Sequence, residues 1–434
     1  MHPILHLDLN TANYKEPDSL DAVLNNSLTE WEKLYGGEPS ETTAPLRFKG
    51  IVERAAKLTG QKTVILIDEY DKPLLQNMTN AVQQEHFRNS LKAFYSVLKT
   101  QDRYIEFAML TGVTKFSKVS VFSDLNNLND ISMDRAYATI CGITEEEIDT
   151  CFKDSVEELA RANGLTIEET RARLKELYDG YHFTPTSAGI YNPFSVLCTF
   201  SKQEFNNYWF ETGTPTFLAE MLKNFKYRLP NLTKEQVTAD VLNSIDSTSL
   251  NPVPIIYQSG YLTITGYNER FKRYRLGFPN KEVEEGFLNF LLPSYAPVEA
   301  KSEFDIIEFV NDVETGNPQQ FMERLRTLFA DTDYKIVGNA ELYFQNVLYL
   351  IFKIMGFYIQ VGRSTANERM DAIIQIADYV YIIECKLDKT ADEALRQIED
   401  NAYARPFAMD RRKLFKIGVN FSTKTRGIES YKIQ

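Results

Sequence analysis

Short apolar runs alternate with amphipathic stretches in the first third of the chain. Residues 63–67 and 105–110 are largely apolar runs of the length of one strand, whereas residues 4–9 alternate between apolar and polar positions. Residues 19–58, with a polar break near 36–44, and residues 82–99 carry apolar side chains at helical spacing. The resulting order of strand, helix, strand, helix and strand predicts a parallel α/β sheet.

The pattern changes in the middle of the chain. Residues 144–222 are predominantly helical and begin with TEEE, a capping-box pattern. Residues 254–266 and 273–278 predict short strands that pair as a hairpin, followed by a helix over residues 282–292. From residue 304 onward the pattern predicts a helix, three strands, a helix and a strand.

These changes in pattern predict a multidomain α/β protein with four segments. They are an α/β module, a helical region, a small β-containing segment that a winged-helix fold would fit, and a second α/β domain. The boundaries are 1–142, 143–250, 251–303 and 304–434.

Composition and charge restrict the class of protein. The formal net charge of −12 means that any contact with nucleic acid must be local and cannot involve the whole protein surface. Residues 361–434, with 13 basic and 11 acidic residues, are nearly balanced in charge and permit such a local contact. Four cysteines without a C-x-x-C pair predict reduced thiols, and only four histidines argue against a His-rich metal site. With neither a signal peptide nor a long apolar run, we expect a cytoplasmic protein without a membrane segment.

Two acidic residues follow the apolar strand at residues 63–67. Asp68 and Glu69 would lie at the carboxyl edge of the sheet, where ligands bind in α/β folds, and Thr111 ends the next predicted strand. Carboxylates at this edge suit Mg²⁺ and the activation of a water molecule. The pattern alone also fits a solvated strand terminus, with Thr111 as a cap.

A second group of candidates lies near the C-terminus. The segments RMDAII (369–374) and YVYIIECK (379–386) read as neighbouring strands joined by a short turn. Such a hairpin would bring Asp371 close to Glu384, and Lys386 would lie on the same face of its strand as Glu384 because side chains alternate. Spacing alone also fits a surface salt-bridge patch.

Several segments resemble the AAA-ATPase-like family that is widespread in gut Bacteroidetes. These are ILIDEYDKPLL (65–75), LTGVTKFSK (110–118), VFSDLNNL (121–128), YDGY (178–181), YNPFS (191–195) and SGYLTI (259–264). The resemblance implies a partial P-loop sheet with a Walker B strand and a lid-like helical region. It also implies nucleotide-site roles for Asp68 and Glu69, and a sensor role for Thr111.

The sequence differs from the family at the phosphate loop. No G-x-x-x-x-G-K-[ST] motif occurs, and GQKT at 60–63 precedes a strand instead of opening a helix. We expect the chain to begin after the family's phosphate loop, so that residues 3–10 form the second strand of the family sheet. We also expect this polypeptide alone not to hydrolyse ATP, which would be a cofactor only in a longer form with a Walker A motif. Oligomerisation is left open.

The C-terminal segment resembles the PD-(D/E)XK nuclease superfamily, with its restriction-endonuclease-like fold. The resemblance implies Mg²⁺ ligands at Asp371 and Glu384, a supporting acid at Glu341 on the preceding helix, a catalytic Lys386 and an auxiliary Gln397. It implies a Mg²⁺-dependent nuclease with nucleic acid as the partner of this domain. The alternative is an AAA-like signalling or scaffold protein whose tail only binds nucleic acid or protein.

Overall fold

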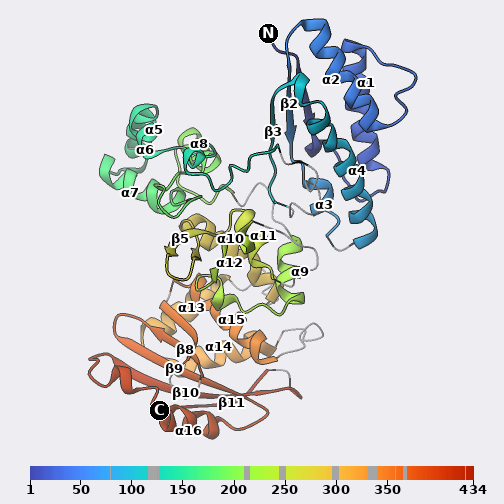
Figure 1. The fold of residues 1–434 in the computed structure, drawn as a ribbon. Coiled ribbons are helices and arrows are strands. Elements are labelled where there is room, and N and C mark those ends of the chain that lie inside the picture. Colours follow the sequence, from blue (N-terminus) through green and yellow to red (C-terminus); the bar gives the residue numbers. More distant parts are fainter. Residues whose placement is uncertain are drawn as a thin grey trace. The chain divides into compact units, whose positions relative to one another are not determined.

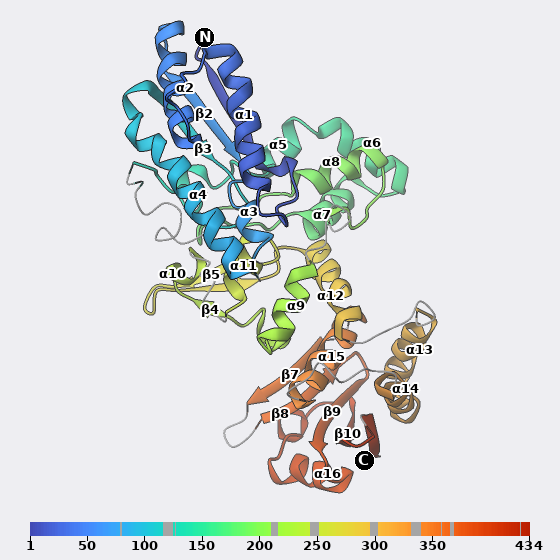
Figure 2. The same ribbon diagram turned by 90° about the vertical axis from the view of Figure 1, so that its right-hand side faces the viewer.

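The computed structural model describes most of the 434 residues. The described ranges are 1–78, 80–115, 125, 127–209, 216–243, 251–295, 303–330, 340–356, 358–364, 369–425 and 427–434. They form two compact units, one of residues 1–137, 237–262 and 269–273, and the other of residues 138–236, 263–268 and 274–434. Figures 1 and 2 show the elements from two directions.

A three-stranded parallel sheet forms the centre of the first unit, as the sequence predicts. Its order is β1 (Ile4–Asp8), β2 (Thr63–Asp68) and β3 (Ile105–Leu110). The alternating residues Leu5 and Leu7 of β1 are buried. Because the strands are parallel, all of their carboxyl ends lie at one edge of the sheet.

Amphipathic helices cover this sheet. They are α1 (Ser19–Tyr35), α2 (Ala44–Thr59) and α4 (Ala81–Thr100), and the short α3 (Lys72–Leu75) contacts α4. Two further short helices of this unit, α10 (Ala239–Leu242) and α11 (Val253–Gln258), contact each other. α2 contacts both α1 and α4. The rings of Phe48 and Phe94 stack between α2 and α4 with centroids 4.4 Å apart. The helical face of each segment is thus buried, as its apolar spacing predicts.

The helix α11 corrects one prediction. All of its residues except Val253 fall in the range 254–266 that was expected to be a strand. They form a helix that begins after Pro252, and the side chain of Asn251 accepts the Val253 amide at 3.0 Å. Proline is favoured in the first helical turn, and a short apolar run does not distinguish a strand from a buried helix.

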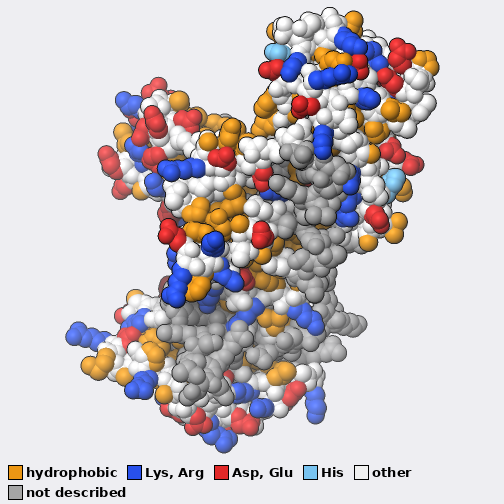
Figure 3. All heavy atoms as spheres, viewed as in Figure 1, with side chains coloured by type: hydrophobic (Ala, Val, Ile, Leu, Met, Phe, Trp, Pro, Cys, Tyr) orange, Lys and Arg blue, Asp and Glu red, His pale blue; other side chains and the backbone are white. Residues whose placement is uncertain are grey.

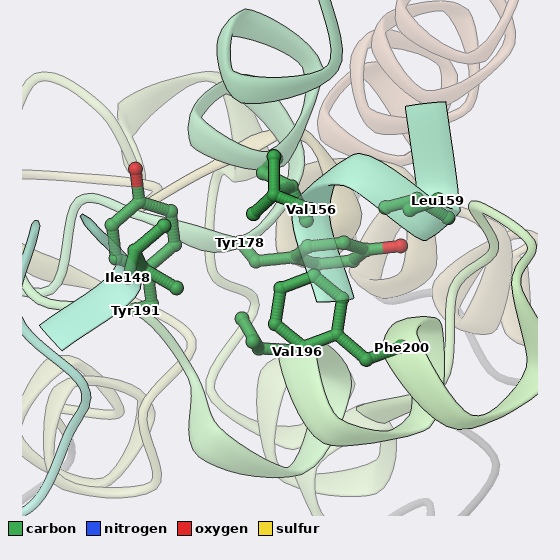
Figure 4. Packing of buried hydrophobic residues seen from close by; sticks show 8 residues of the cluster. Ile148, Val156, Leu159, Tyr178, Tyr191, Val196 and Phe200 are labelled. Carbon is green, nitrogen blue, oxygen red and sulfur yellow. The ribbon is translucent and has the colours of Figure 1, made fainter. Parts of the chain in front are cut away.

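Four helices build a small core at the beginning of the second unit. They are α5 (Glu145–Thr150), α6 (Lys153–Asn163), α7 (Ile167–Tyr178) and α8 (Pro193–Lys202). Thr144 and Thr166 each form a capping box with a glutamate three residues later, which confirms the prediction for α5. Figure 4 shows this core, in which the buried ring of Tyr178 lies among aliphatic side chains and Phe200.

A tight turn follows α7 and uses the motif YDGY. Tyr181 and Ile190 form an isolated antiparallel bridge, with amide-to-carbonyl distances of 3.3 and 3.1 Å. Gly180 has φ of +104°, and an added Cβ would lie 2.1 Å from the carbonyl oxygen of Pro279. The glycine is therefore required by both the backbone angle and the close approach.

A small three-stranded sheet has the order β4, β6, β5. Its strands are β4 (Gln236–Val237), β5 (Thr263–Asn268) and β6 (Arg273–Gly277), so the predicted hairpin is present in a shorter form. The helices near it in sequence are α9 (Thr216–Asn224) and α12 (Lys281–Tyr295).

The C-terminal domain is a five-stranded mixed sheet with the order β11-β10-β9-β8-β7. The elements are α13 (Glu303–Glu314), α14 (Pro318–Ala330), α15 (Ala340–Ile354), β7 (Tyr358–Ser364), β8 (Arg369–Gln375), β9 (Tyr379–Leu387), α16 (Ala391–Asp400), β10 (Lys413–Ser422) and β11 (Gly427–Ile433). The pattern from residue 304 predicted a single strand at the end, whereas β10 is followed by β11, which pairs with it antiparallel.

The helix α16 covers one face of this sheet. Thr390 caps it in a third capping box, and its apolar residues form a cluster with the apolar side chains of β8 and β9. Tyr403 lies just beyond the end of this helix and is fully buried.

All four cysteines are free thiols. Among the described residues, none of the helices has the length and apolar character needed to cross a membrane.

Candidate functional site

Three of the predicted residues meet at the carboxyl edge of the first sheet. Asp68 ends β2, Thr111 directly follows β3, and the hydroxyl of Thr111 donates to Oδ1 of Asp68. Glu69 adopts a left-handed φ of 54°, which is unusual for a residue with a side chain. Burial, with the charges of Asp71 and Asp68 as smaller causes, raises the pKa of Glu69 above its ordinary value. Strain and a raised carboxyl pKa together are typical of a functional edge.

Asp71 is a buried part of this edge that the sequence did not single out. Its carboxylate accepts the amides of Val113 at 3.2 Å and Thr114 at 2.5 Å, and also the Thr114 hydroxyl. A Cβ on Gly112 would lie 2.2 Å from Oδ1 of Asp71. Burial raises the pKa of Asp71, and these donors oppose the rise. The carboxylate therefore holds the start of the loop after β3 in place.

A fourth acid of this edge, which the sequence also did not single out, lies at the end of β1. Asp8 pairs in register with Asp68 and accepts the amide of Asn10 at 2.7 Å. The ammonium group of Lys72 donates to the carbonyl oxygen of Asn10 at 3.1 Å. The same argument that identified Asp68 applies to Asp8, because both end parallel strands of one sheet.

The second candidate site lies on β8 and β9. These strands are antiparallel, and Ala372 pairs with Ile383. Extending this ladder by one residue brings backbone positions 371 and 384 opposite each other, as the hairpin prediction requires. The side chain of Glu384 is 2% exposed. The side chain of Asp371 lies outside the described part of the structure.

Lys386 lies between two of the predicted residues. Its ammonium group is 3.4 Å from Oε1 of Glu384 and also donates to Oε1 of Gln397 on α16. The amide of Gln397 donates to the hydroxyl of Tyr403 at 3.3 Å, and that hydroxyl also accepts from Asn401 at 3.0 Å. Because an ammonium group only donates, Lys386 requires the oxygen of the Gln397 amide to face it, and the buried tyrosine hydroxyl accepts from the nitrogen at the other end.

The neighbouring strand β10 brings α16 close enough for this contact. Gly418 pairs in register with Glu384, and a Cβ on Gly418 would lie 2.3 Å from the carbonyl oxygen of Ala391. Any larger residue would push the start of α16 away from the sheet. The distance between Gln397 and Lys386 thus depends on a glycine that no sequence pattern identified.

Glu341, the predicted supporting acid, falls on α15, but its side chain lies outside the described residues. Gln345, Leu348 and Phe352, which follow position 341 at i+4, i+7 and i+11, are all buried. α15 contacts β7, β8 and β9. The side of α15 that carries these three residues is therefore buried.

Arg412 holds the turn between β8 and β9. Its guanidinium donates to the carbonyl oxygen of Ile376 at 3.0 Å and to the side chain of Gln375 at 2.9 Å. It also forms a bidentate pair with Asp410, the shortest distance being 2.6 Å. This contact stabilises the hairpin that sets positions 371 and 384 opposite each other.

We expect this ion pair to give the domain an acid-sensitive stability. The Arg412 side chain lowers the pKa of Asp410 from 3.8 to about 2. A lowered folded-state pKa contributes stability above pH 3.8 that is lost as the pH falls towards 2. The urea midpoint of Asp410→Asn should lie below that of the wild type above pH 4, and the two should converge towards pH 2. A difference that does not change with pH would contradict the assignment.

The donor set at β8 and β9 fits a hard divalent cation. Carboxylate oxygens are the ligands that Mg²⁺ prefers. Among the side chains that the structure describes, no group of three or more His, Cys, Asp or Glu residues is arranged to hold a metal ion. Two of the three predicted acids, Asp371 and Glu341, are outside that description.

The fold and these sites define a protein with an ATPase-type parallel sheet and a nuclease-type C-terminal domain, and comparisons with known proteins support this class. Residues 1–122 match the family model of a predicted AAA-ATPase, and residues 339–431 match that of the PD-(D/E)XK nuclease superfamily. No solved structure matches.

One curated relative matches along the whole chain. It is described as an uncharacterized protein in the vnfD 5′ region of Azotobacter chroococcum mcd 1. The two are 33% identical over 444 residues, which cover 100% of this chain and 83% of the relative. The chain belongs to the same family, which combines an AAA-ATPase-like region with a PD-(D/E)XK nuclease-superfamily domain.

Proposed function

We propose that the C-terminal domain, residues 304–434, cleaves nucleic-acid phosphodiester bonds with the help of Mg²⁺. Asp371 and Glu384 would hold the metal ion, with Glu341 in support. Lys386 would orient the attacking water, and Gln397 would position Lys386. The observation that carries the proposal is the placement of the Lys386 ammonium group between Glu384 and Gln397, one strand away from position 371.

The chemistry follows from the donors available. When bound, Mg²⁺ would polarise the scissile phosphate and favour deprotonation of the attacking water. An ammonium group has three N–H donors, and two of those on Lys386 point to Glu384 and Gln397. The third can hold the water or a phosphate oxygen, and the fixed positive charge stabilises the negative charge that develops there.

Purified protein incubated with single- and double-stranded DNA and RNA tests the proposal directly. Cleavage in Mg²⁺ or Mn²⁺ that stops on chelation supports it. If no substrate is cut and a divalent-metal titration leaves the melting temperature unchanged, the tail only binds, and the protein is of the signalling or scaffold class.

We further propose that residues 1–142 form an AAA-like module that does not hydrolyse ATP in this polypeptide. The support is that the 434 residues contain the acidic strand end at Asp68 and Glu69 but no phosphate-loop motif. Without backbone amides and a lysine around the phosphates, ATP loses most of its binding contacts. We expect isothermal titration to show no micromolar affinity for ATP with Mg²⁺. A micromolar dissociation constant would refute this part.

A further inference from the structure

The β5–β6 hairpin is a concentrated basic surface on an acidic protein. The seven residues 269–275 contain four cationic side chains and one acid, in a chain of net charge −12. The cations are Arg270, Lys272, Arg273 and Arg275, and all four are exposed. Figure 3 shows lysine and arginine side chains gathered with apolar ones in the region where Figure 1 draws this hairpin.

Most of these charges are not neutralised within the described part of the chain. Arg270, Lys272 and Arg275 form no ion pair with a described carboxylate. A Cβ on Gly266, across the hairpin, would lie 2.7 Å from the Arg275 guanidinium. The missing side chain at Gly266 therefore leaves room for the arginine to lie across β5. Exposed like charges so close together repel each other, and a polyanion would relieve that repulsion.

Aromatic side chains lie among the cations. Phe271 at the turn is 61% exposed, and the guanidinium of Arg270 lies 5.3 Å from the centre of its ring. On the strands, the rings of Tyr267 and Tyr274 are 4.8 Å apart, and Tyr267 is 39% exposed. Exposed rings between cations are the surface that unpaired bases stack on while the cations contact the phosphates. An acidic peptide would use the cations but not the rings.

We propose that the β5–β6 hairpin binds single-stranded nucleic acid, with its cations on the phosphates and Phe271 stacked on a base. The inference rests on the proposed nuclease function for the kind of ligand and adds an element that holds the strand outside the PD-(D/E)XK domain. It gives a net-acidic protein the local positive surface that nucleic-acid binding requires.

The test measures binding of fluorescein-labelled dT20 by anisotropy, with the full chain in EDTA so that no cleavage occurs. The variant R270Q/K272Q/R275Q should bind at least about tenfold more weakly and with a shallower salt dependence, because each lost phosphate contact on a single strand lowers the slope by about 0.7. Phe271→Ala should weaken binding by about five- to 150-fold. The variant R270K/R275K keeps both positive charges, so the dependence of its affinity on salt concentration should have nearly the same slope as that of the wild type.

A matched control separates the hairpin from net charge. K49Q/K62Q/K153Q removes three exposed lysines from other helices and loops and should bind like the wild type. Equal losses in the control and the hairpin variant, unchanged binding by the hairpin variant, or a preference for polyglutamate over dT20 would each overturn the inference. Loss of cleavage in a Glu384 variant that still binds dT20 through the hairpin would leave the inference intact, so the two proposals fail separately.

Discussion

Replacing Glu384 by glutamine should lower the rate of phosphodiester cleavage by at least about 10²- to 10³-fold, the cost typical of removing one preorganised electrostatic group. The substitution keeps the size of the side chain and an oxygen that can accept from Lys386, but it removes the negative charge that a divalent cation needs. Glu384 is nearly fully buried, and the strand register puts it opposite position 371. Its carboxylate is therefore in the proposed metal site and is not part of a solvated surface. Initial rates in Mg²⁺ with the substrate that the wild type cuts best measure the effect.

The control for this variant is Glu399→Gln in the same domain. Glu399 is an exposed residue on α16 that pairs with Lys416. Exposed pairs contribute little, so the rate should stay within about twofold of the wild type. Equal rates for wild type and Glu384→Gln would refute the assignment, and a melting curve for each variant shows whether lost activity reflects lost structure.

Replacing Gly180 by alanine should reduce the local free energy of unfolding around the YDGY turn by roughly 2 to 4 kcal/mol. Two costs add. The residue has φ of +104°, which side chains disfavour, and its new Cβ would meet the backbone carbonyl of Pro279 at 2.1 Å. Hydrogen exchange of the amides of Tyr181 and Ile190, which bond to each other's carbonyl groups, reports on this turn without assuming that the whole chain unfolds in one step.

Gly164 supplies the matched control for that prediction. It ends α6 with φ of +65°, and an added Cβ would meet nothing within 4 Å. Gly164→Ala should therefore cost only about 1 kcal/mol, the price of the backbone angle alone. If the two variants cost the same, the contact with Pro279 does not restrict the turn.

The sequence predicted those parts of the molecule that depend on local pattern. The parallel order of β1, β2 and β3, the long helices, the capping box at Thr144 and the β8–β9 hairpin all follow from periodicity and from residues with restricted backbone angles. The failure at α11 has the same origin, since five apolar residues followed by a glutamine fit either a strand or a helix, and only the contacts at the ends of the helix distinguish them.

The residues of the candidate sites also fall into those that the sequence could identify and those that only the structure revealed. Asp68, Glu69, Glu384 and Lys386 could be identified because acids at strand ends and alternate residues on a strand are visible in the chain. Asp71, Gly418 and Arg412 could not, because their importance lies in contacts with residues far away in sequence.

The amino-acid sequence by itself predicted the family, most of the order of elements and several of the residues with the chemistry of interest, because these depend on neighbours along the chain. The tertiary structure decided which of those residues meet. It put the oxygen of the Gln397 amide, whose nitrogen donates to Tyr403, on the ammonium group of Lys386, and it did so through a close approach of α16 to β10 at Gly418. Close packing between distant segments sets such distances, and no local pattern encodes it.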